Sequence, residues 1–565
     1  SRHPAVRQAA VAVRGEGDGM HLVAYVVWQE GGEVSWAGLL EHLAGFLPAY
    51  MLPARMVTLP SLPLTANGKV DRAALRDPQR PPAQPAAPAR TAFEARTAAL
   101  WAEVLGLEGV GVDDDFLELG GNSLLAMRIA SRVRGELNAD IPIRAFFEAR
   151  TVAGLAAWRG ASPAPEAGPF TPGPGAGRQP GDPAPLSWPQ ESLWLQEQLS
   201  PGNGAYNETL CLRLRGRLDP AALRAACQLL LTRHGTLRTA YSLGTDGPVQ
   251  RVRSGLELPF TAADLSGLGP AARERELAGL LRRHARAPFD LGSPPLLRAL
   301  LARVDPEEHV LLLTVHHIAA DGWSISLLGA ELGPAYRACR DGEPVTVEEP
   351  DAAYPAFAVW QRRALPRPEL DRRLAVWRRM LAGSPVDLEL GADRARRAVS
   401  FEGVRSALAL DEALTRGLTD LGRRLGASLF MVLAAGLAAL VSRRGGGVDV
   451  PIGTPTFGRV RPELESMVGH LVDTTVLRLD LSGDPSFEEL VRRAREATLD
   501  ADRVQVPFEE LVRVLGPERG QRSTGFPRVV LALDDIGAET PSLPGLEVDE
   551  VEVHNGTAKF DLLLS

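Results

Sequence analysis

Two long stretches dense in proline, alanine and glycine set the main limit on how this chain can fold. They are RDPQRPPAQPAAPAR at Arg76–Arg90 and ASPAPEAGPFTPGPGAGRQPGDPAP at Ala161–Pro185. Proline removes a backbone hydrogen-bond donor and fixes φ, so such stretches favour extended spacers over core structure. We therefore expect a multidomain protein, with folded units over residues 1–75, 91–160 and 186–565 joined by these two linkers.

Charge and composition limit the compartment and the partners. The chain has 62 basic and 70 acidic residues, a formal net charge of -8 and no block of basic residues, which argues against a nucleic-acid partner. It has neither an apolar run of about 18 residues nor the start of a signal peptide, so we expect a cytoplasmic protein without a membrane anchor. Cys211, Cys227 and Cys339 lack disulfide or zinc-site spacing and are expected to be buried, reduced thiols.

Hydrophobic patterning gives the first two units different fold classes. Residues 1–75 combine a strand-like run, His21–Trp28, with a helix-like run, Ser35–Pro48, and are expected to form a small α+β subdomain. Residues 91–160 carry apolar positions at helical spacing on both sides of a Gly-Gly-Asn turn, which predicts a compact helical bundle.

The large third unit alternates helices with strands. Helical patterns cover Pro220–Arg233 and Ser428–Val441, and strand-like apolar runs read HVLLLTVHH at 309–317 and FPRVVLALDD at 526–535. This alternation predicts a mixed α/β class.

A serine begins a helix in the middle unit. Ser123 follows Gly120, Gly121 and Asn122 in DDFLELGGNSLLAMRIA, where the helix N-terminus favours a phosphate and the glycines allow close approach to the backbone. A bare Gly-x-Ser would more simply indicate a helix-capping serine. The whole stretch, however, resembles the attachment motif of peptidyl carrier proteins of nonribosomal peptide synthetases. The resemblance implies a four-helix carrier bundle in which a phosphopantetheinyl transferase places 4′-phosphopantetheine on Ser123, although Asn122 replaces the family's usual histidine.

Lys69 lies at the tip of an Asn-Gly turn in LPLTANGKVDRAAL. Considered alone, this residue would be interpreted as an ordinary surface lysine. Pro63–Arg72 resembles the last core motif of adenylation domains, and LPAYMLP at 47–53 resembles the motif before it, so residues 1–75 are similar to an adenylation-domain C-terminal subdomain. In that family the lysine reaches the ATP phosphates and the substrate carboxylate. ATP and Mg²⁺ would serve only the intact adenylation domain, whose core we expect upstream of Ser1, so residues 1–75 alone should not adenylate a substrate.

Two adjacent histidines, His316 and His317, end the apolar run in TVHHIAADGWS. Side chains alternate along a strand, so one imidazole is expected to point into the structure and the other into a cleft. Asp321 lies at the start of the next helix, where it would cap that helix or pair with an arginine. A buried structural pair and a metal site are alternatives, but the metal site lacks a further local ligand and we expect no metal.

The sequence around these histidines resembles a condensation domain from end to end. The resemblance implies two chloramphenicol-acetyltransferase-like lobes, at about 186–350 and about 351–565, around a tunnel with His317 at its middle. Ser192 replaces a usual arginine and Asp473 a usual asparagine. Because the chain stops at KFDLLLS, short of the family's C-terminal strands, we expect a fragment at both ends. The motifs appear in the family's order, as PLSWPQESLWLQEQLSPGNGAYN, RHGTLRTAY, PFDLGSPPLLRALL, YPAFAVWQRR, IGTPTFGRVRPELESMVGHLVDTTVLRL and QVPFEELVRVL.

The resemblance implies that a peptide bond forms between two thioester substrates. The amine of an acceptor aminoacyl thioester, on a downstream carrier domain, would attack the aminoacyl or peptidyl thioester held on Ser123. An α-amine with a pKa of about 7.7–8.0 is partly neutral near pH 7, so positioning by His317 should matter more than its action as a base. Asp321 and Arg459 are expected to form an ion pair. The residues in and around the HHxxxDG motif to which a structural supporting role is assigned are His316, Asp321, Gly322, Arg233, Arg238 and Arg459.

Two alternatives concern the function itself. An epimerisation domain shares the lobes and the HHxxxDG pattern, but DGWS and the long IGTPTFG segment are more typical of condensation, and Asn122 is not the aspartate common in carriers that serve epimerases. A non-catalytic carrier-docking module is disfavoured by the intact His317, Asp321 and Gly322. Because no epimerisation domain fits in the linker after the carrier, we expect a donor of L-configuration or one that ends in glycine.

Overall fold

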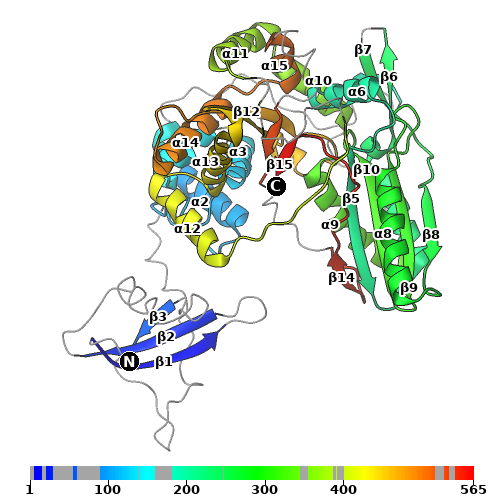
Figure 1. Cartoon of the computed structure of the whole chain (residues 1–565), viewed down its shortest axis with the longest axis horizontal. Coiled ribbons are helices and arrows are strands. Elements are labelled where there is room, and N and C mark those ends of the chain that lie inside the picture. The colour runs from blue at the N-terminus through cyan, green and yellow to red at the C-terminus, as the bar shows by residue number, and fades with distance from the viewer. Residues whose placement is uncertain are drawn as a thin grey trace, which may run out of the picture. The chain divides into compact units, whose positions relative to one another are not determined.

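The structure is a computed structural model of the 565-residue chain (Figure 1). The chain divides into two compact units, one of Ser1–Pro88 with Leu410–Gly417 and the other of Ala89–Ala409 with Leu418–Ser565. The described residues are 5–14, 21–29, 55–59, 89–137, 139–159, 181–245, 247–343, 354–385, 388, 390, 400–515, 527–533 and 541–565.

The N-terminal unit contains a three-stranded sheet in the order β1-β2-β3. β1 (Val6–Arg14) pairs antiparallel with β2 (His21–Trp28), and β3 (Arg55–Thr58) pairs parallel with β2. The strand predicted over 21–28 is therefore confirmed. Lys69, the helix predicted over Ser35–Pro48 and most of both predicted linkers lie outside the described residues.

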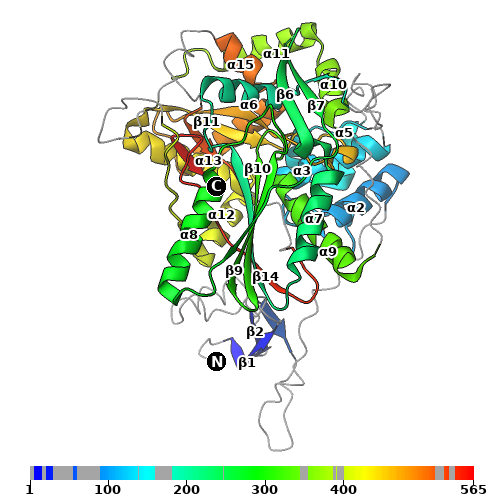
Figure 2. The ribbon, with the colours of Figure 1, turned by 90° about the vertical axis from the view of Figure 1, so that its right-hand side faces the viewer.

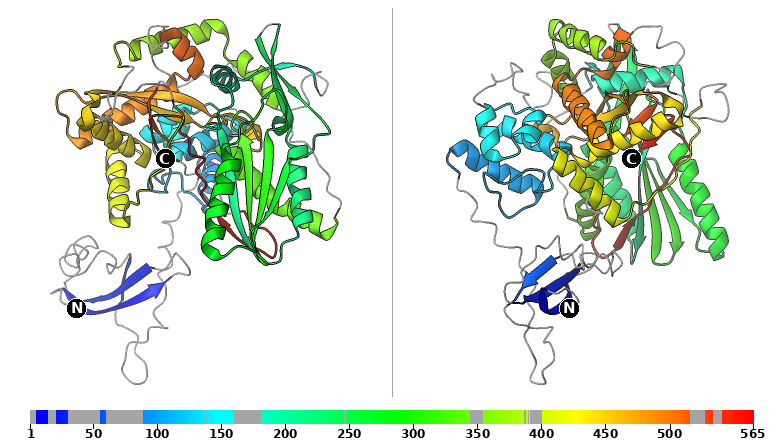
Figure 3. Two further views of the ribbon diagram at one scale, coloured as in Figure 1. Left: turned by 45° about the vertical axis from the view of Figure 1, so that its right-hand side comes forward. Right: turned by 60° about the vertical axis from the view of Figure 1, so that its left-hand side comes forward.

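The compact unit that starts at Ala89 begins with a bundle of four helices, which Figure 3 shows in blue to cyan in its right panel. Thr91 caps the first helix, because its hydroxyl accepts the N–H of Glu94 while the Glu94 side chain accepts the N–H of Thr91. The core contains Trp101, Phe116 and Phe146 in mutual contact, because the ring centroid of Phe116 lies 5.1 Å from that of Trp101 and 5.4 Å from that of Phe146, and the latter two lie 6.0 Å apart. The bundle predicted over 91–160 is therefore confirmed. Its helices are α2 (Ala92–Leu105), α3 (Ser123–Leu137), α4 (Ile143–Glu148) and α5 (Val152–Arg159).

The first lobe that follows the bundle is built on a five-stranded sheet in the order β14-β5-β10-β9-β8. Neighbouring strands are antiparallel except β8 and β9, which are parallel. Figure 2 shows this sheet between α8 (Pro270–Arg286) on one side and α7 (Pro220–Arg233) with α9 (Gly322–Asp341) on the other. The strands are β5 (Asn207–Arg215), β8 (Phe260–Asp264), β9 (Leu297–Asp305), β10 (Glu308–His316) and β14 (Glu547–Glu550).

Both faces of this sheet are covered, so its central strand is apolar along most of its length. Along β10, Leu311 and Leu313 pack in one core with α7 and α9. Val310 and Leu312 point to the opposite face and pack in a second core with α8. This alternation is that of an extended strand, and it holds β10 rigidly up to its last residue, His316.

One strand of this sheet comes from near the end of the chain. β14 lies along β5, with Glu547 opposite Arg215 and Glu550 opposite Leu212. The expected boundary between the lobes at about residue 350 therefore does not hold for this segment, because a strand far along the chain completes the sheet of the first lobe.

The second lobe has a four-stranded sheet in the order β12-β11-β13-β15. β11 is antiparallel to β12 and parallel to β13, and β13 is parallel to β15. The mixed α/β class predicted for the third unit is confirmed, although β13 covers only part of the strand predicted over 526–535. The strands are β11 (Asp449–Thr456), β12 (Asp473–Asp480), β13 (Val529–Leu531) and β15 (Leu562–Leu564).

Several helices complete the third unit. α6 precedes the first-lobe sheet, and the others follow α9 along the chain. A small sheet in the order β4-β7-β6 accompanies the first lobe. The bounds are α6 (Trp188–Leu199), α10 (Tyr354–Ala364), α11 (Arg367–Met380), α12 (Glu412–Leu425), α13 (Leu429–Val441), α14 (Phe487–Arg503), α15 (Phe508–Leu515), β4 (Ala184–Pro185), β6 (Thr239–Gly244) and β7 (Gly247–Val252).

One helix among the described residues, Leu429–Gly446, has the length and composition to cross a membrane. It consists of α13 and the turn after it, and α13 packs against α14 and β11 of the second lobe. Ser428 caps it, and residues such as Met431 and Ala434 are fully buried. This burial is typical of a core helix.

The three cysteines are free thiols. Cys211 and Cys227 are buried, and burial raises the pKa of both thiols to about 12. Cys339 is only partly buried, so the expectation of three buried thiols is wrong for this residue. It lies in the last turns of α9, at the edge of the first-lobe core.

Candidate active site

The two adjacent histidines have different surroundings. His316 is the last residue of β10 and its side chain is buried. Its Nδ1 accepts the N–H of Ile318 at 3.1 Å, and burial lowers its pKa to about 3. The side chain of His317 is 17% exposed, and its backbone N–H donates to the carbonyl of Tyr206 at 2.7 Å. His316 is thus a neutral residue of the interior, whereas His317 has access to a space outside the core.

The hydrogen bonds of His317 fix its tautomer. Nδ1 lies 2.9 Å from the carbonyl oxygen of Ala320. A carbonyl oxygen only accepts, so Nδ1 carries the proton and donates it. Nε2 therefore has a free lone pair. A nitrogen of this kind can accept a hydrogen bond from an amine and can take up its proton.

Two charged side chains from distant parts of the chain face His317. Oε1 of Glu208, on β5, lies 3.7 Å from Nδ1 of His317, and Lys559 forms an ion pair with the same oxygen. Burial lowers the pKa of His317 and Lys559 lowers it further, while Glu208 opposes both effects. Burial raises the pKa of Glu208, but Lys559 and His317 outweigh it and hold that pKa below its ordinary value. A neutral His317 thus lies beside a charged Glu208–Lys559 pair.

A third histidine lies against His317. The ring centroids of His317 and His470 are 4.4 Å apart, at an interplanar angle of 60°. The backbone of this segment is fixed, because the N–H of Gly469 donates to Oγ of Ser324 at 3.0 Å and the Tyr354 hydroxyl donates to the His470 carbonyl. A Cβ on Gly469 would lie 2.1 Å from Cδ2 of Tyr354, so only glycine fits there. Burial, and then His317, hold the pKa of His470 well below its ordinary value.

Asp321 joins the start of α9 to the segment that carries His470. The guanidinium of Arg459 donates to its two carboxylate oxygens at 2.7 and 3.0 Å, and both side chains are fully buried. The N–H groups of Leu471 and Val472 donate to Oδ2 at 3.0 and 3.3 Å. Burial opposes ionisation of Asp321, but Arg459 outweighs it and holds the pKa well below the usual range. The expected ion pair and the expected helix cap are both present.

Arg233 is the last residue of α7, and Arg238 ends the short 3-10 helix that follows it, Gly235–Arg238. Arg238 is buried, and its guanidinium donates to the carbonyl oxygens of Leu231 and Thr232 at 2.9 Å. These are among the last carbonyls of the helix, which lack partners within it. Arg233 pairs with Glu331 of α9 at 3.4 Å. The two arginines therefore stabilise the end of α7 and its packing against α9.

Ser123 is the first residue of α3. The side chain that caps this helix is that of Asn122, whose Oδ1 accepts the N–H of Leu125 at 2.9 Å. The Ser123 hydroxyl is buried and has no hydrogen-bond partner. A Cβ on Gly121 would lie 2.5 Å from the ring and the carbonyl oxygen of Phe116, so glycine is required at that position. The serine therefore does not act as the helix cap, and its oxygen serves no structural bond.

The two departures from the family pattern, Ser192 and Asp473, both interact with Glu509. The Asp473 carboxylate accepts the N–H groups of Thr474 at 2.7 Å and Phe508 at 3.4 Å. Burial raises the pKa of Asp473 to about 7, and Glu509 adds to this effect. Burial also raises the pKa of Glu509, which a hydrogen bond from Ser192 partly offsets. Two carboxyl groups of unusually high pKa thus lie close together at the start of β12.

The four-helix bundle contacts the third unit through arginines of α3. The Arg128 guanidinium lies 5.2 Å from the ring centre of Trp323, at the start of α9. Arg132 pairs with Glu465 at 3.3 Å. The helix that begins at Ser123 therefore contacts the two segments that Asp321 and Arg459 hold beside the histidines.

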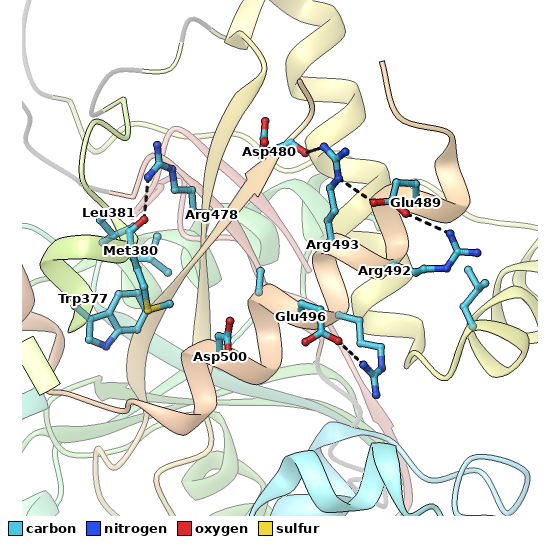
Figure 4. A pocket seen from close by; sticks show the side chains of 14 residues that line it. Trp377, Met380, Leu381, Arg478, Asp480, Glu489, Arg492, Arg493, Glu496 and Asp500 are labelled. Atoms are coloured by element: carbon cyan, nitrogen blue, oxygen red, sulfur yellow. Dashed lines mark hydrogen bonds and ion pairs between the residues drawn. The ribbon is translucent and has the colours of Figure 1, made fainter. Parts of the chain in front are cut away.

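A pocket of about 700 Å³ lies in the second lobe, between α11, β12 and α14 (Figure 4). Its charged side chains largely neutralise one another, as Arg493 with Glu489 at 3.3 Å and Arg495 with Glu496 at 2.6 Å. None of its lining residues belongs to the histidine motif or to the serine site. We therefore do not consider it the centre of the chemistry.

Glu208, Lys559 and His470 were not identified from the sequence. Each is a single polar residue in a different segment, and only the fold brings them to His317. The sequence does contain one signal for Lys559. The chain has only two lysines, Lys69 and Lys559, so 60 of its 62 basic residues are arginines.

Three family models match different parts of the chain. The condensation domain model matches residues 181–565, the phosphopantetheine attachment site model matches 95–159, and the AMP-binding enzyme C-terminal domain model matches 1–69. The order of the three matches is that of the three units inferred from the linkers.

Curated relatives cover the whole chain. A linear gramicidin synthase protein of Brevibacillus parabrevis is 37% identical over 571 residues, which are 100% of this chain and 11% of that protein. The dimodular nonribosomal peptide synthase of Bacillus subtilis (strain 168) is 38% identical over 577 residues, 100% of this chain and 24% of that protein. The chain thus spans about a tenth to a quarter of the length of these two relatives.

Solved structures match the large unit. The X-domain from teicoplanin biosynthesis has a TM-score of 0.62 and 30% identity, over 69% of this chain and 86% of that one. The first condensation domain of the calcium-dependent antibiotic synthetase, in complex with a substrate analogue, has a TM-score of 0.55 and 25% identity, over 67% and 86%. The chain therefore belongs to the condensation-domain family of nonribosomal peptide synthetases, with a carrier domain and an adenylation-type C-terminal subdomain before the condensation domain.

Proposed function

We propose that the chain forms a peptide bond between two carrier-bound substrates. The donor is an aminoacyl or peptidyl group held on Ser123, and the acceptor is an aminoacyl thioester on a downstream carrier domain. The observation that carries this proposal is the tautomer of His317. With Nδ1 donating to Ala320 and the side chain partly exposed, Nε2 offers its lone pair to an incoming amine.

The residues of the chain supply positioning and a route for one proton. 4′-Phosphopantetheine on Ser123 would supply a thiol that holds the donor as an activated thioester. His317 accepts a hydrogen bond from the acceptor amine through Nε2, which directs the nitrogen lone pair at the donor carbonyl. It takes the proton that the nitrogen loses as the C–N bond forms, and returns that proton to sulfur as the C–S bond breaks. Orientation and proton transfer by one side chain are each common sources of rate enhancement.

The carrier site supports the same proposal. The Ser123 hydroxyl has no structural partner, and the bundle contacts the start of α9 through Arg128 and Trp323. A phosphopantetheinyl transferase is the partner that would modify the serine. We propose further that the donor has L-configuration or ends in glycine, and that the protein works in the cytoplasm. Lys69 would act only together with an adenylation core that binds ATP and Mg²⁺.

Two other functions compete with this one. The family matches are to condensation domains, which does not favour epimerisation of the carrier-bound residue. A docking role has one specific observation behind it, because one matching solved structure is a complex of the X-domain with OxyB. The free Nε2 of His317 favours catalysis over docking alone.

A single-turnover experiment separates the three functions. Ser123 is loaded with an L-aminoacyl phosphopantetheine by a phosphopantetheinyl transferase and aminoacyl coenzyme A. An acceptor aminoacyl N-acetylcysteamine thioester is then added in D₂O, and the products are identified by mass spectrometry. Condensation gives a dipeptidyl thioester without deuterium at the donor α-carbon. Deuterium at that carbon without an amide would indicate epimerisation, and neither change would indicate docking.

A further inference from the structure

The chain uses lysine at only two positions, and one of them lies beside His317. Elsewhere its basic residues are arginines, 60 of 62. The Lys559 ammonium pairs with Oε1 of Glu208 and lies 5.7 Å from the ring centre of Tyr206, whose carbonyl accepts the N–H of His317. A lysine is a compact point charge, whereas the planar guanidinium of arginine tends to bind both oxygens of a carboxylate. A lysine here leaves Glu208 free to face the imidazole as well.

Glu208 and Lys559 come from opposite ends of the large unit. Glu208 lies on β5, directly opposite Val315 of β10, so the sheet fixes its backbone beside the histidine motif. Lys559 lies just before β15 of the second lobe. Their ion pair thus connects the two lobes at the site, with side-chain exposures of 27% for Glu208 and 24% for Lys559.

We propose that Glu208 and Lys559 are positioning residues for the condensation reaction. Glu208 faces the protonated Nδ1 side of His317, and Lys559 balances the charge of Glu208. Nε2 of His317 therefore stays unprotonated until it receives the proton of the amine. In the resting enzyme the pair places almost no net charge next to the imidazole. When Nε2 takes the proton, the Glu208 carboxylate at 3.7 Å stabilises the imidazolium. When the proton moves on to sulfur, His317 is neutral again and the Glu208–Lys559 pair once more places almost no net charge beside it.

The other ionisable groups that face His317 do not replace this pair. His316 and His470 are buried imidazoles whose pKa values burial lowers, so both are neutral near pH 7. The Asp321 carboxylate is neutralised by Arg459 at 2.7 Å. Among these groups, Glu208 and Lys559 are therefore the two whose opposite charges act on His317 without being neutralised by a third group.

The proposal rests on the condensation function but makes a prediction of its own, because the two charges should move one pKa in opposite directions. Lys559→Met removes the positive charge and should raise the pKa of His317 by roughly one unit, while Glu208→Gln should lower it by a similar amount. The double variant should return it to near the parent value. The pKa is read from the ¹³Cε1 resonance of His317, assigned with a His317→Asn variant. The acid limb of the pH profile of kcat/KM for the acceptor should shift in parallel.

A matched ion pair provides the control. Arg213 of β5 and Glu308 of β10 form an ion pair at 2.7 Å within the first-lobe sheet, with side-chain exposures of 23% and 24%. Glu308→Gln should leave both the His317 resonance and the pH profile unchanged. The double variant leaves neither charge of the pair without its partner, so it stays informative if a single variant folds poorly.

The outcomes separate this inference from the reaction itself. Opposite shifts that cancel in the double variant support it, whether or not an amide forms. If the parent protein forms the amide but neither single variant measurably shifts the His317 pKa, or both shift it in the same direction, the inference is overturned. If the resonance shifts as expected and no variant or parent forms an amide, the condensation function fails while the charge coupling stands.

Discussion

The Arg459 guanidinium and the Asp321 carboxylate form two hydrogen bonds, of 2.7 and 3.0 Å, at a place where neither side chain is exposed. Removing two charges from water costs several kcal/mol per ion, and good geometry with further hydrogen bonds must offset that cost. Here the N–H groups of Leu471 and Val472 supply the further bonds. The pair therefore fixes the start of α9 against the segment of His470.

The first prediction concerns this ion pair. Arg459→Met keeps most of the side-chain volume but leaves the Asp321 carboxylate buried without its cation. We expect the free energy of unfolding of the condensation domain to fall by about 3–5 kcal/mol, measured by urea denaturation. Arg217→Met is the control, because Arg217 and Glu307 are 93% and 64% exposed and such pairs contribute little. Equal losses in the two variants would contradict the structural role of the buried pair.

The second prediction concerns Asp473 and pH. Its folded-state pKa is raised from 3.8 to about 7, so the folded protein keeps a proton that the unfolded chain loses between these values. The free energy of unfolding should therefore decrease as pH rises from about 4 to about 7, by up to about 4 kcal/mol for this one group. Asp473→Asn should stabilise the protein at pH 8 and have little effect at pH 4, as measured by thermal unfolding.

Asp480, at the other end of β12, is the control for this prediction. Hydrogen bonds from Ser482 lower its pKa, so Asp480→Asn should not give a stabilisation that grows with pH. An equal gain from Asp473→Asn at pH 4 and pH 8 would show that the carboxyl group is not the cause.

The third prediction concerns loading of the carrier domain. Incubation with a phosphopantetheinyl transferase and coenzyme A should add one phosphopantetheine group, seen by intact-protein mass spectrometry. Ser123→Ala should abolish the addition. Ser131→Ala, in the same helix, should keep it, because Ser131 is a buried residue of the bundle core. Modification of the Ser123 variant would place the attachment site elsewhere.

Local patterns in the sequence predicted much of the candidate active site. Side-chain alternation along β10 predicted that His316 and His317 would face different surroundings, and they do. The position of Asp321 after the strand predicted that it would cap the helix or pair with an arginine, and the structure shows that it does both. These features depend on residues a few positions apart, where strand and helix periods determine direction.

Features that join distant segments could not be predicted in the same way. β14 pairs with β5 across more than three hundred residues, and a strand pattern does not name its partner. Glu208, Lys559 and His470 each come from a different segment, so their arrangement around His317 appears only in the fold. The rarity of lysine was a signal for Lys559, but it indicated no partner.

The fourth prediction compares the two adjacent histidines. His316→Ala removes a buried imidazole that accepts the N–H of Ile318 and packs edge-on to Phe289. It should lower thermal stability but leave the single-turnover rate within about threefold of the parent at temperatures where the protein is folded, since this side chain is buried in the interior. A large loss of rate in a folded His316→Ala protein would mean that the roles of the two histidines are assigned the wrong way round.

The rate of amide formation by His317→Ala is the most direct test of the proposed function. The carrier domain is loaded with a donor, an acceptor aminoacyl thioester is added, and the dipeptidyl product is quantified over time beside the parent and His316→Ala proteins. Without Nε2 to orient the amine and relay its proton, the rate should fall by roughly 10²-fold or more, while loading of Ser123 and the unfolding temperature stay near those of the parent. A His317→Ala protein that forms the amide at the parent rate would contradict the proposed role of His317.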